Sequence, residues 1–141
     1  MSDKRGIEIK DLTKVFGSRT AVDNISLDIK DGELFALLGI NGAGKTTTIK
    51  MLTALSIPTS GDALLNGYSV VNSPEKVKEI VNVSPQETAV AGNLTVRENL
   101  AFIAGVYDVK DRSRINEIIS EFKFDEIINQ RAKTLSGGWQ R

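Results

Sequence analysis

The sequence Gly-Ile-Asn-Gly-Ala-Gly-Lys-Thr at residues 39–46 constrains this chain more than any other feature. It follows the pattern of a glycine, four residues, a second glycine, a lysine and a serine or threonine. The glycines let the backbone curl so that successive N–H groups point at phosphate oxygens. The lysine supplies positive charge to the phosphates, and the threonine hydroxyl is placed to bind Mg²⁺. The pattern therefore predicts a phosphate-binding loop at residues 39–46.

The segments on either side of this loop supply the context that such a site requires. An apolar run at 34–38 is typical of a strand buried on both faces of a sheet. Helical spacing over 49–55 predicts a helix after the loop, and its positive N-terminal end would face the same anion. Alternation over 7–12 predicts an earlier strand, and 22–29 predict another that is irregular around Asn24.

Beyond the loop the predicted elements change from strands to helices. Residues 64–67 predict a short strand and a tight turn. Ser73 before a proline predicts a helix that runs to about Ile80. The apolar residues over 80–83 predict one more strand, which ends at Ser-Pro-Gln over 84–86.

Two further helices are predicted in the last third of the chain. Thr95 and Glu98 have the spacing of a capping box, in which the hydroxyl and the carboxylate each satisfy a backbone donor. Asp111 is placed to cap a second helix, whose apolar residues over 115–122 recur on one face.

Two segments have alternative interpretations. Residues 101–107, followed by Asp108, could form a strand that ends in a magnesium-binding aspartate, but the capping box before them favours a helix. The Phe-Asp-Glu sequence at 124–126 resembles an acidic pair at a strand end, but Lys123 interrupts any buried strand. An exposed helix start is favoured there.

Composition restricts the classes of protein that the chain could represent. Apolar residues make up 40% and charged residues 26% of the sequence, as in ordinary globular proteins. The 18 basic residues balance 18 acidic ones, so no net charge favours nucleic acid or an anionic membrane surface. The absence of cysteine suits the cytosol, and no apolar run approaches the roughly 20 residues that span a bilayer. We therefore expect no nucleic-acid partner and no direct membrane insertion.

A second motif, Leu-Ser-Gly-Gly at residues 135–138, narrows the choice among phosphate-binding proteins. With the sequence over 39–48 and Gln86 after a predicted strand, it resembles the nucleotide-binding domain of ABC transporters in order and spacing. The resemblance implies an α/β fold, namely a P-loop NTPase core with an N-terminal β-subdomain and a helical subdomain, truncated before the Walker B strand. The strand-rich core would span about 1–90, and the helical subdomain, ending in the signature motif, about 91–141.

The resemblance also implies how the chain would hold ATP and Mg²⁺. Phe16 would stack on adenine, because it lies at the distance before the loop where this family places an aromatic ring. Thr46 and Gln86 would bind Mg²⁺, and Thr47 would reach the side of the α-phosphate. The implied nucleotide-binding residues are Phe16, Gly39, Ile40, Asn41, Gly42, Ala43, Gly44, Lys45, Thr46, Thr47, Gln86, Ser136, Gly137 and Gly138.

The signature residues would serve a second subunit. Ser136, Gly137 and Gly138 begin a helix that, in this family, faces the γ-phosphate held by another ATPase domain, so that a head-to-tail dimer encloses ATP. Trp139 stands where the family commonly has glutamine. We expect that change to be tolerated, because the phosphate contacts come from the serine and the backbone amides.

The residues that this family uses for hydrolysis are not found in the sequence. The family places a strand ending in Asp-Glu after the signature, and a switch histidine farther on. This sequence reaches Arg141 within the signature helix and contains no histidine. We therefore expect nucleotide binding without turnover and no catalytic residue within the chain. Without the Walker B strand the sheet would have an open apolar flank, which another chain or a rearranged element would have to cover.

The implied function is that of the ATP-binding subunit of a transporter, cytoplasmic and held at the inner face of the cell membrane by a membrane-spanning permease. The start of the helix after the loop, and residues 94–100, look most like the branch that powers drug, antibiotic or lipid-type exporters. Two alternatives stay open. One is a soluble ABC ATPase that acts outside transport, and the other is a nucleotide-binding module that does not hydrolyse ATP.

Overall fold

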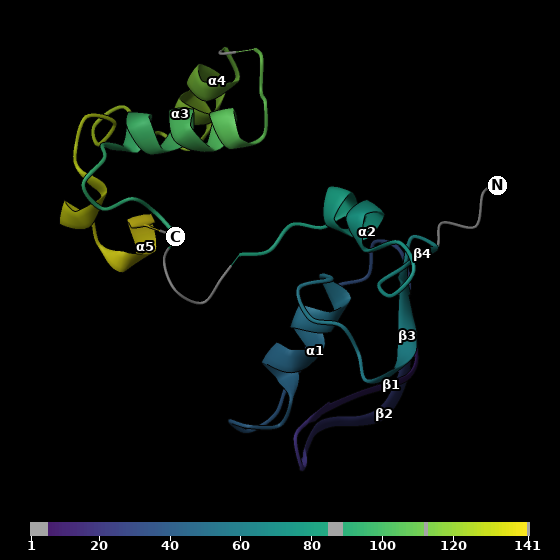
Figure 1. Cartoon of the computed structure of the whole chain (residues 1–141). Coiled ribbons are helices and arrows are strands. Elements are labelled where there is room, and N and C mark those ends of the chain that lie inside the picture. The colour runs from purple at the N-terminus through teal and green to yellow at the C-terminus, as the bar shows by residue number, and fades with distance from the viewer. Residues whose placement is uncertain (1–5, 85–88, 112, 141) are drawn as a thin grey trace. The chain divides into compact units, whose positions relative to one another are not determined.

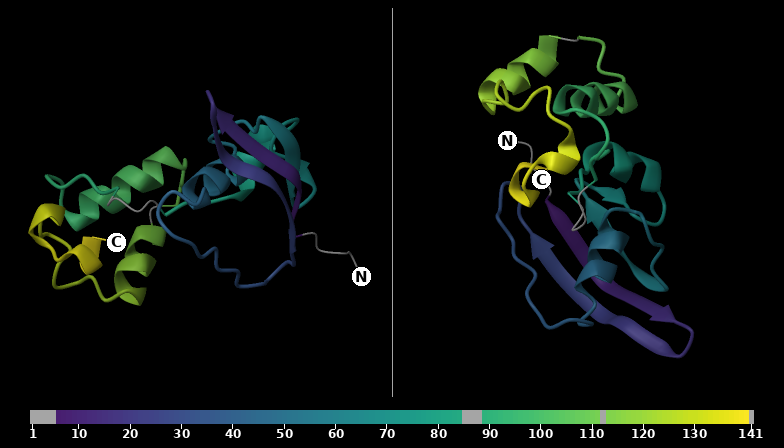
Figure 2. Two further views of the ribbon diagram at one scale, coloured as in Figure 1. Left: turned by 90° about the horizontal axis from the view of Figure 1, so that it is seen from below. Right: turned by 90° about the vertical axis from the view of Figure 1, so that its left-hand side faces the viewer.

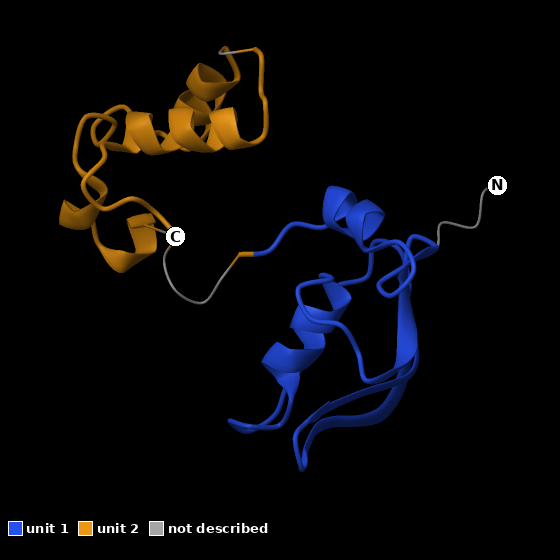
Figure 3. Ribbon diagram, in the orientation of Figure 1, with its two compact units in different colours: residues 1–83 blue, residues 84–141 orange. Residues whose placement is uncertain are grey.

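The computed structural model describes residues 6–84, 89–111 and 113–140 of the chain (Figure 1). The chain forms two compact units, unit 1 with residues 1–83 and unit 2 with residues 84–141 (Figure 3). Each unit has its own cluster of buried apolar side chains. No helix among the described residues is long and apolar enough to cross a membrane.

Unit 1 is built on an antiparallel sheet of four strands in the order β2-β1-β3-β4 (Figure 1). The strands are β1 (Ile7–Phe16), β2 (Arg19–Ile29), β3 (Ser60–Leu65) and β4 (Tyr68–Ser69). The strands predicted at 7–12 and 22–29, and the short one predicted after the loop, are confirmed. Because β1 pairs with both β2 and β3, it is an interior strand of this sheet.

The pairing of β1 with β2 is irregular near Asn24, as predicted. Asn24 and Asp11 have positive φ angles of 44° and 49°. The Asn24 N–H donates to the Thr13 hydroxyl at 3.0 Å, and the Asp11 N–H donates to the Ser26 hydroxyl at 2.9 Å. Side-chain oxygens thus satisfy backbone donors at points where the register of the two strands shifts.

Two helices complete the core of unit 1. These are α1 (Lys45–Leu52) and α2 (Pro74–Ile80), both close to their predicted positions. Met51 from α1, Val77 from α2 and Leu12 from β1 are all 0% exposed. The remaining buried members of this core are Ile9, Val22, Leu52, Ala63, Leu65 and Val70. Apolar burial from strands and helices therefore holds α1, and the loop before it, against the sheet.

Two predicted strands are not formed. Residues 33–40 have no regular structure, residues 31–40 are all exposed, and Leu34 is 100% exposed. Figure 2 shows this part of the chain as a long loop between β2 and α1. The predicted strand at 80–83 is also wrong, because α2 includes Ile80 and residues 81–84 are irregular. The physical reason is the same for both, since a buried strand needs hydrogen-bonding neighbours and none of the described strands pairs with either segment.

Unit 2 is helical. Its elements are α3 (Val96–Val106), α4 (Ser113–Glu121), the 3₁₀ turn η1 (Ala132–Thr134) and α5 (Gly137–Gln140). Ile115, Ile119 and Ile128 form its buried cluster, with Val96 and Leu100 of α3 packed against it. The alternative strand at 101–107 is excluded, because these residues lie in α3 and the turn after it. Residues 124–126 form neither a strand nor a helix, but the start of a series of turns.

The first helix of unit 2 begins with the predicted capping box. The Glu98 N–H donates to the Thr95 hydroxyl at 3.2 Å, and the Thr95 N–H donates to Glu98 Oε2 at 2.7 Å. These hydrogen bonds, the backbone one first, hold the pKa of Glu98 below its ordinary value. The box therefore fixes the start of α3 by two reciprocal bonds.

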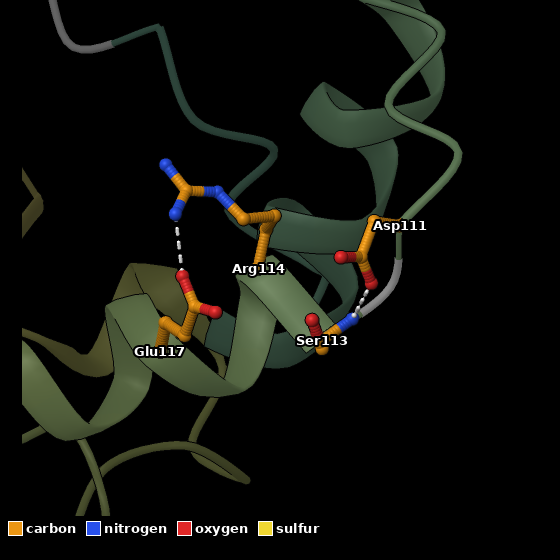
Figure 4. Close-up of polar contacts among 4 residues, drawn as sticks. All are labelled: Asp111, Ser113, Arg114 and Glu117. Atoms are coloured by element: carbon orange, nitrogen blue, oxygen red, sulfur yellow. Dashed lines mark hydrogen bonds and ion pairs between the residues drawn. The ribbon is translucent and has the colours of Figure 1, made fainter.

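Asp111 precedes α4 and satisfies a backbone donor at its start, as predicted (Figure 4). Its carboxylate accepts from the Ser113 N–H at 2.9 Å. Hydrogen bonds from Ser113 lower the pKa of Asp111. Within α4, Ile115 and Ile119 are buried but Ile118 and the following Phe122 are exposed. Only part of the predicted apolar face is therefore buried against other described residues.

The capping box predicts a pH dependence for the stability of unit 2. The pKa of Glu98 is lowered from 4.5 in the folded chain, so its contribution is complete above that value and is lost as the pH falls through the folded pKa. The free energy of unfolding should therefore fall more steeply with acidification in the parent chain than in Glu98→Gln. Urea denaturation between about pH 7 and about pH 3 measures both slopes.

The matched control for this prediction is Glu121→Gln. The Glu121 carboxylate makes no hydrogen bond or ion pair with the described residues, so this variant removes a carboxylate of α4 without altering the capping box and should keep the steeper slope that the box produces. Equal slopes for the parent chain and Glu98→Gln would contradict the stabilising role of the box.

Candidate functional site

The phosphate-binding loop leads directly into α1 and is held against β2. Gly42 and Gly44 have φ angles of 88° and 85°, in the left-handed region that favours glycine. A Cβ atom on Gly44 would lie 2.4 Å from the Ala21 carbonyl oxygen, so only glycine fits there without a backbone shift. The Thr48 hydroxyl also donates to the Gly44 carbonyl at 3.1 Å. The curl of the loop is therefore built into the packing of unit 1.

The backbone amides of the loop are largely without acceptors. Within the described residues, only the Ala43 N–H is bonded, to the Ile40 carbonyl at 3.2 Å. The amides that have no acceptor are those of Asn41, Gly42, Gly44, Lys45, Thr46 and Thr47. They precede or begin α1, whose N-terminal end carries the positive end of the helix dipole. This arrangement suits an anion with several oxygen acceptors, such as a phosphate chain.

Lys45 closes the loop on itself. Its ammonium group donates to the Gly39 carbonyl at 2.6 Å and to the Ile40 carbonyl at 2.8 Å. The side chain therefore lies along the loop, with its charge at the loop's N-terminal end. The same three donors of a lysine ammonium can bond phosphate oxygens once an anion is present.

The proposed magnesium ligands are only partly described. Thr46 lies in the first turn of α1 and is exposed, so its hydroxyl is accessible to a cation that also contacts bound phosphates. Gln86 lies outside the described residues. No group of three or more carboxylate, histidine or cysteine side chains among the described residues could hold a metal by itself. The hydroxyl of Thr46 thus fits Mg²⁺ that arrives with a nucleotide, which would supply most of its other ligands.

Phe16 is the last residue of β1. Its side chain is 54% exposed, and the Lys14 ammonium lies 5.0 Å from its ring centroid. Phe16 pairs with Arg19 across the turn of the β1–β2 hairpin. A Cβ atom on Gly42 would lie 3.7 Å from an Arg19 guanidinium nitrogen. The hairpin end therefore lies next to the loop, and the same end of unit 1 carries both (Figure 1).

The signature residues form the start of α5 in unit 2. The Gln140 N–H donates to the Ser136 carbonyl at 3.0 Å, whereas the amides of Gly137, Gly138 and Trp139 have no acceptor among the described residues. No atom of the described residues would lie within 4 Å of a Cβ on Gly137. The backbone is therefore open to an external group at this point.

Trp139 has a structural contact that the sequence pattern did not predict. Its ring meets Phe124 edge-on at a centroid distance of 6.0 Å, and Phe124 stacks on Phe122 at 5.6 Å. The Gln140 side chain also donates to the Leu135 carbonyl at 2.8 Å. These contacts attach α5 to the rest of unit 2, which gives the departure from glutamine at Trp139 a packing role.

The structure brings some predicted site residues together within unit 1. Residues 39–47 form one continuous loop and helix start, and the hairpin that carries Phe16 lies beside them. Ser136 to Gly138 belong to the other unit. Arg19 is the neighbour of the loop that sequence reasoning missed. Its position three residues after Phe16, across a tight turn, is the only signal that could have indicated it.

Comparisons with known proteins agree with the sequence resemblance. The family model described as "ABC transporter" matches residues 22–141. The chain is 46% identical over 114 residues to the probable multidrug ABC transporter ATP-binding protein YbhF of Escherichia coli, covering 81% of this chain and 20% of that protein. It is 38% identical over 143 residues to the phospholipid-transporting ATPase ABCA3 of Homo sapiens, covering 96% of this chain and 8% of that protein.

Two further relatives extend the comparison. The spermidine/putrescine import ATP-binding protein PotA of Nitrosospira multiformis is 37% identical over 135 residues, covering 94% of this chain and 37% of that protein. A solved structure described as "Structure of ATP binding subunit of ABC transporter" superposes with a TM-score of 0.77 at 28% identity, covering 95% of this chain and 57% of that chain.

These comparisons also give the share of each relative's length that this chain spans. The chain spans between 8% and 37% of the length of the curated relatives named above. The structural likeness confirms the predicted α/β class and P-loop ATPase fold. Since the family model covers most of the sequence, the chain belongs to the ABC transporter family and carries part of its ATP-binding domain.

Proposed function

We propose that residues 39–46 bind the phosphates of MgATP or MgADP. The observation that carries this proposal is the curled loop, whose amides from Asn41 to Thr47 have no acceptor in the described part of the chain except at Ala43. A polyphosphate offers several oxygen acceptors to these donors at once, and the positive end of α1 favours its charge. Lys45 then exchanges its bonds to Gly39 and Ile40 for bonds to phosphate oxygens.

The remaining contacts are proposed from the family resemblance and the positions of the residues. Phe16 offers an exposed ring on which adenine can stack. Thr46 contributes a hydroxyl to Mg²⁺, which neutralises charge on the phosphates, and Gln86 supplies a second oxygen ligand. Ser136, with the open backbone at Gly137 and Gly138, contacts the γ-phosphate bound by a second ATPase domain in a head-to-tail dimer.

At the level of the whole protein we propose an ATP-binding subunit that drives transport. Residues of about 1–90 form the nucleotide-binding core and about 91–141 the helical subdomain. The subunit works at the cytoplasmic face of the cell membrane through a membrane-spanning permease. The relatives are named for multidrug transport, phospholipid transport and polyamine import. Export is proposed from the resemblance of the start of α1 and of residues 94–100 to the exporter branch. The relative with the highest identity of the three, 46%, is named for multidrug transport.

The 141-residue chain is proposed to bind nucleotide without hydrolysing it. Phosphoryl transfer to water needs a group that orients the attacking water. The sequence contains no histidine, and its Asp125-Glu126 pair lies in exposed turns. The chain therefore has no residue for the role of the family's switch histidine. The Asp125-Glu126 pair does not lie at the end of a strand, where the family places its Asp-Glu pair.

The test combines binding and turnover on the same preparation. Isothermal calorimetry with MgATP should give a saturable isotherm, while a phosphate-release assay should give the rate of the protein-free blank. Saturable binding together with turnover above the blank would refute the non-hydrolysing proposal. No binding to MgATP or MgADP would refute the nucleotide-binding proposal itself.

A further inference from the structure

Arg19 is a cation that lies directly beside the phosphate-binding loop. It is the first residue of β2 and pairs with Phe16 across the hairpin turn. One of its guanidinium nitrogens lies 3.7 Å from the position that a Cβ on Gly42 would occupy. Because Gly42 has no side chain, the guanidinium group can approach the loop backbone. All three residues belong to unit 1.

The charge of Arg19 is not used within the described part of the chain. Its guanidinium makes no ion pair and no hydrogen bond with residues 6–84, 89–111 or 113–140. By contrast, the ammonium groups of Lys14 and Lys45, both in unit 1, have hydrogen-bond partners. The Lys14 ammonium donates to the Ile57 carbonyl at 2.5 Å, and Lys45 donates to two loop carbonyls. Arg19 is therefore the cation at this site whose five donors are available to a ligand.

We propose that Arg19 is a further nucleotide-binding residue, which contacts the phosphate chain of MgATP or MgADP held by residues 39–46. This inference rests on the nucleotide-binding function proposed above. A guanidinium group matches the geometry of phosphate oxygens and keeps its charge at all physiological pH values. Arg19 pairs with Phe16 across the hairpin turn, and its guanidinium lies beside Gly42, so it belongs to the hairpin end that carries the proposed adenine-stacking ring and also reaches the proposed phosphate-binding loop.

The test measures nucleotide affinity in Arg19→Ala and Arg19→Gln, with Arg114→Ala as the matched control. Arg114 is an exposed arginine of unit 2 whose ion pair is with Glu117 (Figure 4), so the control changes net charge equally without touching the loop. We expect Arg19→Ala to weaken binding of MgATP about ten-fold, the effect of losing one charge-assisted contact. Arg19→Gln should weaken MgATP binding to a similar extent. Glutamine can still donate a hydrogen bond, but it lacks the positive charge on which the contact with phosphate depends. Arg114→Ala should bind like the parent chain.

A second readout separates a phosphate contact from a structural role. If Arg19 contacts phosphate, its removal should weaken MgATP and MgADP but leave the affinity for adenosine unchanged. An equal loss for adenosine and MgATP would overturn the proposal, because it would indicate a displaced hairpin. A parent-like affinity for MgATP in both Arg19 variants would also overturn the proposal for Arg19. If Lys45→Ala loses binding in the same experiment, the proposed nucleotide-binding function stands. Absence of binding in the parent chain would refute both.

Discussion

Replacing Lys45 with alanine should weaken the binding of MgATP by about 100-fold, because at least two charge-assisted hydrogen bonds to phosphate oxygens are lost. In the chain without nucleotide, Lys45 instead bonds the carbonyls of Gly39 and Ile40. The variant therefore also loses two bonds that hold the loop closed. Calorimetric titration of the parent chain and the variant with MgATP measures the change in affinity.

Lys50→Ala is the matched control for this substitution. Lys50 lies in the last turn of the same helix. Both substitutions therefore replace a lysine of α1 with alanine and change the net charge by the same amount, but Lys50→Ala leaves the loop unchanged. The control should bind MgATP as the parent chain does, and thermal unfolding should show that both variants are folded. An unchanged affinity in Lys45→Ala would contradict the role assigned to this residue.

Replacing Gly44 with alanine should reduce the free energy of unfolding by about 3 kcal/mol and abolish nucleotide binding. The residue has a φ of 85°, which costs a non-glycine residue about 1 kcal/mol. The larger part of the effect comes from the new Cβ, which would lie 2.4 Å from the Ala21 carbonyl and 3.1 Å from the Val22 side chain. Either the loop moves away from β2 or the hairpin shifts, and both disturb the site.

Gly32→Ala separates these two contributions. Gly32 has a similar φ of 76°, but no atom would lie within 4 Å of its Cβ. Only backbone strain is introduced, so this variant should lose about 1 kcal/mol and keep its affinity for nucleotide. Urea denaturation followed by circular dichroism gives the free energy of unfolding of the Gly44→Ala and Gly32→Ala variants. Equal losses in the two variants would show that the packing of the loop against Ala21 does not matter.

Local signals in the sequence predicted much of the fold. The capping box depends on Thr95 and Glu98, three residues apart, and the helix after Ser73 on a serine directly followed by a proline; both are found. The glycines of the phosphate-binding loop were predicted to curl it, and two of them adopt left-handed angles. The bend around Asn24 was visible as a break in alternation. Each of these features is decided within a few residues.

Most of the failures concern partners that are distant in sequence; the helix start favoured at 124–126, which is a turn instead, is a local one. Residues 34–38 have the composition of a buried strand, but a strand forms only where neighbouring strands accept its hydrogen bonds. The same is true of residues 80–83. In α4, Ile118 has the right spacing for a core face, but no described element covers it. Arg19 was missed for a related reason, since its contact with Gly42 depends on how the hairpin packs against the loop.

The central claim is that MgATP binds to the backbone amides at residues 41–47, and amide NMR tests it most directly. In a titration of the ¹⁵N-labelled chain with MgATP, the account predicts saturable shifts at Gly42, Gly44, Lys45 and Thr46, which lie at the proposed phosphate site. Amides of α2, which lies at the end of unit 1 away from the loop (Figure 1), should move little, which makes them an internal reference. Saturable shifts that spare residues 41–47, or no shifts at any concentration of MgATP, would contradict the claim.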